Sequence, residues 1–115
     1  MSSMPGYIQV GPTCYRVTTD ELDVLRREKE LETGLFGYGD HKALIFGISS
    51  EAALDVQKET LMHEVLHALF WLVGKPLTTD AEEDVVARLS PLLLDTLQRN
   101  PTLVSYLTQT KEEPF

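Results

Sequence analysis

The most regular pattern of apolar positions lies in the middle of the chain, between residues 54 and 73. Apolar residues recur there every three or four positions, which is the spacing of one face of an α-helix. They are Leu54, Leu61, Val65, Leu66, Leu69, Leu72 and Val73. Ser49 or Ser50 is placed to cap its start, unless a break near residues 55–57 delays it. Gly74 is placed to end it, so the pattern predicts one long, mostly buried helix.

A second helix is predicted between residues 79 and 99. Thr79 or Asp80 is the expected N-cap residue, with a glutamate three residues later as in a capping box. Pro91 is expected to kink the helix, and Asn100, which precedes a proline, is expected to end it. The residues expected on its buried face are Val85, Val86, Leu89, Leu92, Leu93 and Leu97. The chain therefore carries two consecutive helices that can pack against each other.

The first half of the chain is predicted to form short strands. Tyr7–Val10 and Cys14–Thr18 are rich in β-branched and aromatic residues, and the residues between them predict a hairpin turn. A second hairpin is predicted around Gly39–Asp40. Its second strand, the apolar run Ala43–Gly47, is either a core strand or an edge strand along which an extended peptide can pair. The charged segment between the hairpins, Thr18–Glu32, is either a short helix or an exposed loop.

Together these elements predict an α+β fold, in which a small antiparallel sheet of two hairpins packs on the two helices. The 115 residues suit a single domain spanning residues 1–115, and the 43% of hydrophobic residues allow one modest core. No apolar run reaches the length of a membrane span, and no secretion signal is recognised, so we expect a cytoplasmic protein. The single cysteine, Cys14, fits such a reducing compartment.

The charge balance narrows the class of partner. The formal net charge is -8, and the sequence pI is about 4.7. No cluster of Lys and Arg is larger than the pair Arg26–Arg27, whereas binding along a phosphate backbone needs a basic surface. We therefore expect no nucleic-acid partner and no membrane partner, and a peptide or protein substrate instead. The sequence does not indicate an oligomeric state.

Two of the three histidines lie inside the first predicted helix, in the stretch HEVLH. His63 and His67 are four residues apart, so they project from one face of the helix and both can reach one ion. Zinc binds neutral histidine nitrogens at roughly 2.0–2.1 Å. Glu64 points about 100° further round the helix, where it can take a proton from a water on the ion. The pattern predicts Zn2+ as the cofactor and Glu64 as the catalytic base; the alternative is a polar stripe on a surface helix.

The stretch ETLMHEVLHAL resembles the signature of zincin metallopeptidases, in the form found in compact phage- and prophage-encoded members. It is similar to the ImmA/IrrE-type and SprT-like minimal metallopeptidases, and the similarity extends from about Gly34 to Pro101. The resemblance implies a zinc-dependent hydrolase of peptide bonds in the cytoplasm of a bacterium or a phage-infected host. Such families usually take a third zinc ligand, often a glutamate, from the next helix.

The acidic run that opens the second helix supplies the candidates for that third ligand. They are Glu82, Glu83 and Asp84. Glu82 is preferred because its spacing places it on the predicted buried face, and Glu83, about 100° away, is the alternative. His67 lies seven residues before Gly74, so it is roughly 10 Å from that end of the helix. If the second helix ran strictly antiparallel to the first, Glu82 would lie near the Gly74 end and could not reach the zinc ligand His67. Either the first helix ends early or the two helices cross at an angle.

Other side chains and functions stay open at this point. His41, in the turn of the second hairpin, is a further candidate ligand. Tyr38, His41 and Tyr106 are candidates for stabilising the oxyanion that forms during peptide hydrolysis. A non-proteolytic zincin-like module that binds metal or regulates is the alternative function, and a purely structural domain is the third. Four protein ligands would favour the module, whereas an open position on the ion would favour the enzyme.

Overall fold

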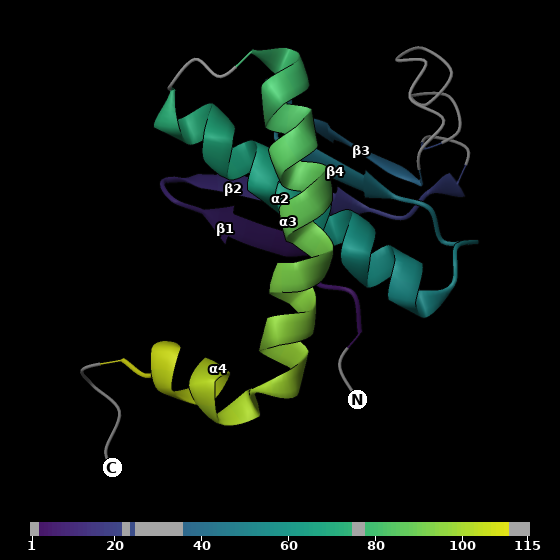
Figure 1. Ribbon diagram of the computed structural model, residues 1–115. Helices are drawn as coiled ribbons and strands as arrows, with labels where there is room; N and C mark the ends of the chain where they lie inside the picture. Colours follow the sequence, from purple (N-terminus) through teal and green to yellow (C-terminus); the bar gives the residue numbers. More distant parts are fainter. Residues whose placement is uncertain (1–2, 22–23, 25–35, 75–77, 111–115) are drawn as a thin grey trace.

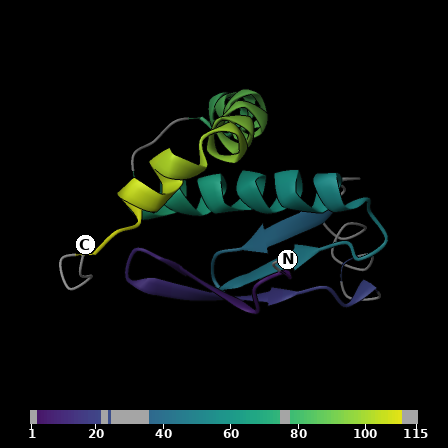
Figure 2. The same ribbon diagram turned by 90° about the horizontal axis from the view of Figure 1, so that it is seen from below.

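The chain folds into three layers, a β-sheet, helix α2 and helix α3, stacked in that order (Figure 1, Figure 2). The layers are seen in a computed structural model that describes residues 3–21, 24, 36–74 and 78–110. The strands are β1 Tyr7–Val10, β2 Thr13–Thr18, β3 Gly37–Asp40 and β4 Ile45–Ile48. The helices are α2 Leu54–Val73, α3 Thr79–Arg99 and α4 Pro101–Leu107. The predicted α+β class is confirmed, and none of the helices in these ranges is long and apolar enough to cross a membrane.

The sheet is mixed rather than antiparallel throughout, with the strand order β1-β2-β4-β3. Both predicted hairpins form, β1 with β2 and β3 with β4. The second hairpin joins the first through its second strand, so β2 and β4 run parallel, with Arg16 opposite Ile45. The prediction of a purely antiparallel sheet is wrong because turn residues fix the pairing within a hairpin but not which strands meet between hairpins. Among the described strands, β4 is therefore an inner core strand and β3 lies at the edge beside it.

The turn of the second hairpin lies later in the chain than predicted. Gly39 and Asp40 belong to β3, and residues 41–44 form the turn. The Asp40 carboxylate accepts hydrogen bonds from the backbone N–H groups of Lys42 and Ala43, at 3.0 and 2.9 Å. Asp40 thus shapes the turn from the end of the strand, which makes His41 the first turn residue.

Helix α2 begins at Leu54 without a side-chain cap, because its N-cap residue is Ala53. Ser49 and Ser50 do not cap it, contrary to the prediction, since the chain continues for several residues before the helix starts. The helix then runs without a break to Gly74, which ends it as predicted in a left-handed conformation, with φ 68°.

The N-cap residue of helix α3 lies one residue before the predicted Thr79 or Asp80. It is Thr78, whose hydroxyl oxygen accepts a hydrogen bond from the Ala81 N–H at 3.1 Å. The helix continues through Pro91 and ends at Asn100, as predicted.

The buried face of α3 agrees with the predicted one only in part: Val86 is buried as predicted, and Leu93 and Leu97 are partly buried. Val86 and Ser90 are 0% and 1% exposed, whereas Val85, Leu89 and Leu92, which were expected to be buried, are 39%, 42% and 67% exposed. Helix α3 crosses α2 steeply, so that Figure 2 shows α3 nearly end-on while α2 lies along the sheet. Because the crossing is steep, only a short face of α3 meets α2, on the side of Val86 and Ser90. Apolar spacing predicts a helix but not which of its faces finds a partner.

The core lies between the sheet and α2. Its buried centre consists of Val10, Tyr15, Phe46 and Ala68. Partly buried residues pack around it: Ile8, Val17, Leu44, Leu61, Val65 and Leu72. The members from α2 recur every three or four residues, so they form one row that faces the sheet. His63 and His67 lie off this row, on the side of α2 that α3 covers.

A carboxylate away from the histidines fastens the segment that leads into α2. Glu21 accepts hydrogen bonds from the Ser49 hydroxyl at 2.8 Å and from the Ser50 N–H at 2.9 Å. These bonds, that of the Ser49 hydroxyl above all, lower the pKa of Glu21. Of the segment predicted as a helix or loop over Thr18–Glu32, residues 22–23 and 25–32 lie outside the described residues.

We predict that Glu21→Gln lowers the midpoint of thermal unfolding near pH 7, while Glu51→Gln, a change at a nearby exposed glutamate, leaves it unchanged. The folded-state pKa of Glu21 lies below its ordinary value of 4.5, so the carboxylate stabilises the fold above that pH. The stabilisation is lost as the pH falls through the lowered pKa, so the unfolding midpoints of wild type and Glu21→Gln should then converge. Circular-dichroism melts over a pH series measure this, and equal midpoints for wild type and Glu21→Gln at pH 7 would contradict it.

Candidate metal centre

Two imidazoles meet on the face of α2 that turns away from the sheet. His63 and His67 lie one helical turn apart, with ring centroids at 4.9 Å and their Nε2 atoms at 3.2 Å. Both side chains are largely buried, 16% and 17% exposed. Burial lowers the pKa of His63, against the opposing charge of Glu83, and so favours the neutral ring that can bind a metal.

Glu83 of α3 completes a group of three ligand atoms. Its carboxylate oxygens lie 3.2 Å from His63 Nε2 and 2.8 Å from His67 Nε2. One ligand atom from each of the three residues lies within 4.8 Å of the others. Ligand atoms on a tetrahedral zinc ion, each at roughly 2.0–2.1 Å, are about 3.3 Å apart. The three side chains are therefore spaced as they would be around one shared ion.

Glu82 contacts the opposite edge of the same histidine. Its Oε2 lies 2.6 Å from His67 Nδ1, so the two glutamates hold the His67 ring between them. A carboxylate on Nδ1 fixes the proton there and leaves the lone pair of Nε2 for a metal. The structure thus places Glu83, the alternative third ligand from the sequence, beside the two Nε2 atoms, and Glu82, the preferred one, behind His67. Asp84 pairs with Arg88 on the surface and does not join the group.

The steep crossing of α2 and α3 resolves the difficulty raised by the sequence. Helix α2 does not end early, because it reaches Val73. Instead α3 crosses it at an angle (Figure 1), and Glu82 and Glu83, near the start of α3, reach His67 with their side chains. Glu82 and Glu83 lie four and three residues before the buried Val86, so the rotation that buries Val86 turns both carboxylates toward His67.

Glu64 is buried beside this group but is not one of its three members. The residue is 6% exposed, and burial raises the pKa of its carboxyl to about 7, against the opposing effect of His67. Strand β3 passes directly beside this carboxylate at Gly39. A β-carbon added to Gly39 would lie only 2.9 Å from Glu64 Oε1. Within the described part of the chain, no group donates a hydrogen bond to this carboxylate. A buried, unbonded carboxylate is costly, which points to a role in chemistry.

His41 lies beside the group, held from two sides. Its Nδ1 is 2.9 Å from the Tyr15 hydroxyl, and its ring stacks on Trp71, with centroids 5.4 Å apart. A β-carbon added to Gly39 would also lie 3.4 Å from His41 Cε1, so His41 and Glu64 both lie beside this glycine. Burial lowers the pKa of His41, and His67 lowers it further, while Glu82 and Asp40 oppose the shift. His41 is therefore a neighbour of the centre rather than a member of the ligand group.

The other two candidates for oxyanion stabilisation are placed differently. Tyr38 alternates along β3 with Gly37 and Gly39, which face α2, so its ring lies on the opposite face of the sheet. Tyr106 belongs to α4, which contacts only α3 among the described elements. Helix α4 follows the end of α3 that lies away from the crossing with α2 (Figure 1). Of the three candidates, His41 alone adjoins the histidines.

Two supporting residues were not predicted from the sequence. Trp71 follows His67 by four residues and so extends the row of His63 and His67 along α2, a spacing that could have revealed it. Tyr15 lies far from His41 in the chain, and only the pairing of β2 with β4 brings them together.

Comparisons with known proteins identify no relative of this chain. A scan against protein-family models finds no match to this chain, and neither does a search of curated proteins or of solved structures. Function is therefore inferred from the geometry of the centre.

We predict that the chain binds zinc and that the two adjacent glutamates contribute unequally. Glu83→Gln removes a ligand and should weaken zinc binding more than Glu82→Gln, which removes the partner of His67 Nδ1 and should cost about 10- to 100-fold in affinity. Asp84→Asn, a change in the same helical turn but away from the group, should have no effect. Isothermal calorimetry with competing chelators measures all three, and a larger loss for Glu82→Gln than for Glu83→Gln would reverse the assignment.

Proposed function

We propose that this chain is a compact zincin-like metallopeptidase that hydrolyses peptide bonds. The observation that supports this most is the convergence of His63, His67 and Glu83 beside a separate buried carboxylate, Glu64. Metal ligands alone would suit a storage or structural site, whereas a carboxylate next to the ligands suits a site that moves protons.

The ligand set fits zinc. Two neutral imidazoles and one carboxylate are ligand types that zinc accepts, and three protein ligands leave a fourth position for water or substrate. When bound, zinc lowers the pKa of water and polarises a carbonyl group. Glu82 holds His67 in the tautomer that presents Nε2 to the ion.

The remaining side chains divide the proton chemistry. Glu64 takes a proton from the attacking water and returns it to the amine that leaves, as a general base and then a general acid. His41 lies beside the same glycine as Glu64, Gly39, with its ring fixed by Tyr15 and Trp71. From there it stabilises the oxygen of the scissile carbonyl as negative charge develops on it.

We predict that Glu64→Gln abolishes peptide hydrolysis but leaves zinc binding intact, because it removes the base without removing a ligand. A loss of at least about 100-fold is expected for a general base. His63→Ala should lose both zinc and hydrolysis, and Asp84→Asn should lose neither. A mixture of unstructured peptides, with cleavage read by mass spectrometry and zinc by elemental analysis, provides the measurement.

The outcomes separate the two functions raised by the sequence. Hydrolysis by Glu64→Gln at the wild-type rate would refute the assignment of the base. Retention of zinc by a wild-type protein that cleaves no peptide in the mixture would instead indicate the non-proteolytic metal-binding module.

A further inference from the structure

Tyr15 brings a hydroxyl group from the core to the edge of the candidate metal centre. The residue is 0% exposed, and its ring stacks on that of Phe46, with the centroids 4.2 Å apart and the planes at 6°. Its strand, β2, lies between β1 and β4, so its backbone is held on both sides. The hydroxyl oxygen therefore has a fixed position, 2.9 Å from His41 Nδ1.

The hydrogen in this bond comes from Tyr15. A hydroxyl that accepted a hydrogen from Nδ1 would need a second acceptor for its own hydrogen, and leaving that hydrogen unbonded in the core is costly. In the described part of the chain, the hydroxyl reaches no acceptor other than His41 Nδ1. Burial raises the pKa of Tyr15 and lowers that of His41, so the phenol keeps its hydrogen and the imidazole stays neutral. A neutral imidazole whose Nδ1 accepts carries its own hydrogen on Nε2.

The rest of the His41 ring is held as well. One face stacks on Trp71, with the centroids 5.4 Å apart. Cε1, the carbon between the two ring nitrogens, lies toward Gly39, and the same glycine adjoins Glu64 Oε1. Because Tyr15 occupies Nδ1, the Nε2–H group is the polar part of the ring left for a substrate.

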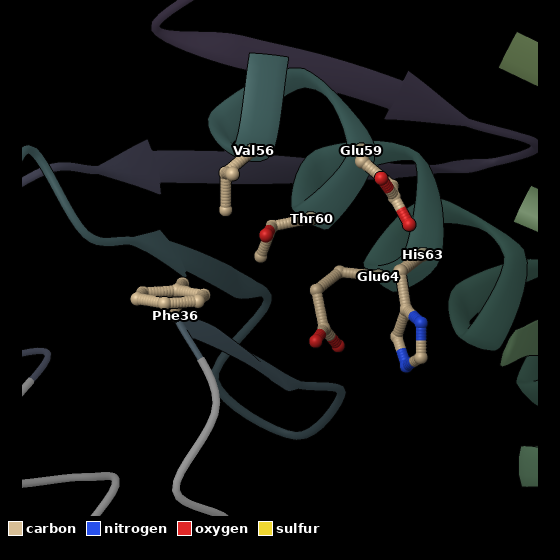
Figure 3. Close-up of a pocket in the computed structure, with 6 residues that line it drawn as sticks. All are labelled: Phe36, Val56, Glu59, Thr60, His63 and Glu64. Atoms are coloured by element: carbon tan, nitrogen blue, oxygen red, sulfur yellow. The ribbon is translucent and has the colours of Figure 1, made fainter. Parts of the chain in front are cut away.

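A pocket beside the centre gives a bound peptide access to these groups (Figure 3). Its lining includes His63 and Glu64, whose side chains point the same way from α2 in Figure 3. The tautomer of His41 then decides the sign of its effect on a scissile carbonyl. An Nε2–H donates to the carbonyl oxygen as negative charge develops there, whereas a bare Nε2 lone pair would repel it.

We propose that Tyr15 is a positioning residue for the hydrolysis: by donating its hydroxyl hydrogen to Nδ1, it keeps His41 in the Nε2-protonated tautomer that stabilises the substrate oxygen. The inference rests on the proposed function, because His41 has this task only if the centre hydrolyses peptides. Tyr15 acts through His41 and has no contact of its own with the reacting atoms. A change inside the core of the sheet should therefore alter the reaction without removing any ligand.

The tautomer of His41 tests the first step without requiring hydrolysis. Long-range hydrogen–nitrogen NMR correlations of isotope-labelled histidine distinguish a protonated from a bare ring nitrogen, above the ordinary imidazole pKa of 6.5. We expect wild-type His41 to carry its hydrogen on Nε2, with and without zinc, and Tyr15→Phe to populate both tautomers. Tyr7→Phe is the matched control, because it removes the hydroxyl of an exposed tyrosine on β1, and it should leave the His41 signals unchanged. His41→Gln identifies those signals by their loss.

Kinetics of the zinc-loaded chain test the second step. Tyr15→Phe should lower kcat about tenfold and leave KM and the zinc affinity unchanged, because the donor acts on charge that develops in the transition state. His41→Gln should lower kcat at least as much. Adding Tyr15→Phe to His41→Gln should cost nothing further, since Tyr15 acts through His41. Tyr7→Phe should match wild type.

Three results would each overturn the inference and leave the metal centre intact. They are a hydrogen on Nδ1 in wild-type His41, an unchanged tautomer or kcat in Tyr15→Phe, and a further loss when Tyr15→Phe is added to His41→Gln. A wild-type chain that cleaves no peptide would instead overturn the proposed function and, with it, the role of Tyr15 in hydrolysis. The NMR result would then still show whether Tyr15 sets the tautomer of His41, so the two failures are distinguishable.

Discussion

Helix α2 carries two rows of side chains that need opposite surroundings, and the fold depends on keeping them apart. The apolar row, from Leu61 to Leu72, packs on the sheet. The other row, His63, His67 and Trp71, turns toward α3 and the turn after β3. Glu64 lies between them, which explains how a carboxylate comes to be buried within a helix that also forms the core. Rotating the helix by one residue would press the histidines into the core, at the cost of burying them without partners.

The steep crossing of α3 supplies those partners. Glu82 and Glu83 reach both nitrogens of His67, so that ring is satisfied on each edge. The crossing brings the carboxylates of Glu82 and Glu83 to the two imidazoles, beside the carboxylate of Glu64 on α2. Like charges held this close are unfavourable, and a divalent cation bound among them would become the largest local charge and offset their repulsion. The centre is therefore built from groups that a cation would stabilise together, which favours a metal over a simple hydrogen-bonded cluster.

The sequence predicted helices α2 and α3, both hairpins and the meeting of His63 with His67, because these follow from local spacing and turn chemistry. It did not predict the parallel pairing of β2 with β4, which depends on how two separately formed hairpins dock. It placed Val86 correctly on the buried face of α3 but made that face too wide, since Val85 and Leu89 look buried until the crossing angle is known. The spacing that favoured Glu82 could not show which oxygen of the acidic run would reach the two Nε2 atoms.

The central claim is that His63, His67 and Glu83 bind one zinc ion and leave a position open. Zinc K-edge X-ray absorption of the zinc-loaded chain tests it most directly, since it reports the atoms around the ion. We predict two imidazole nitrogens and two oxygens at roughly 2.0–2.1 Å, with one imidazole lost in His67→Ala and one oxygen replaced or lost in Glu83→Gln. An ion surrounded by oxygens alone, or a spectrum unchanged by both substitutions, would contradict the account.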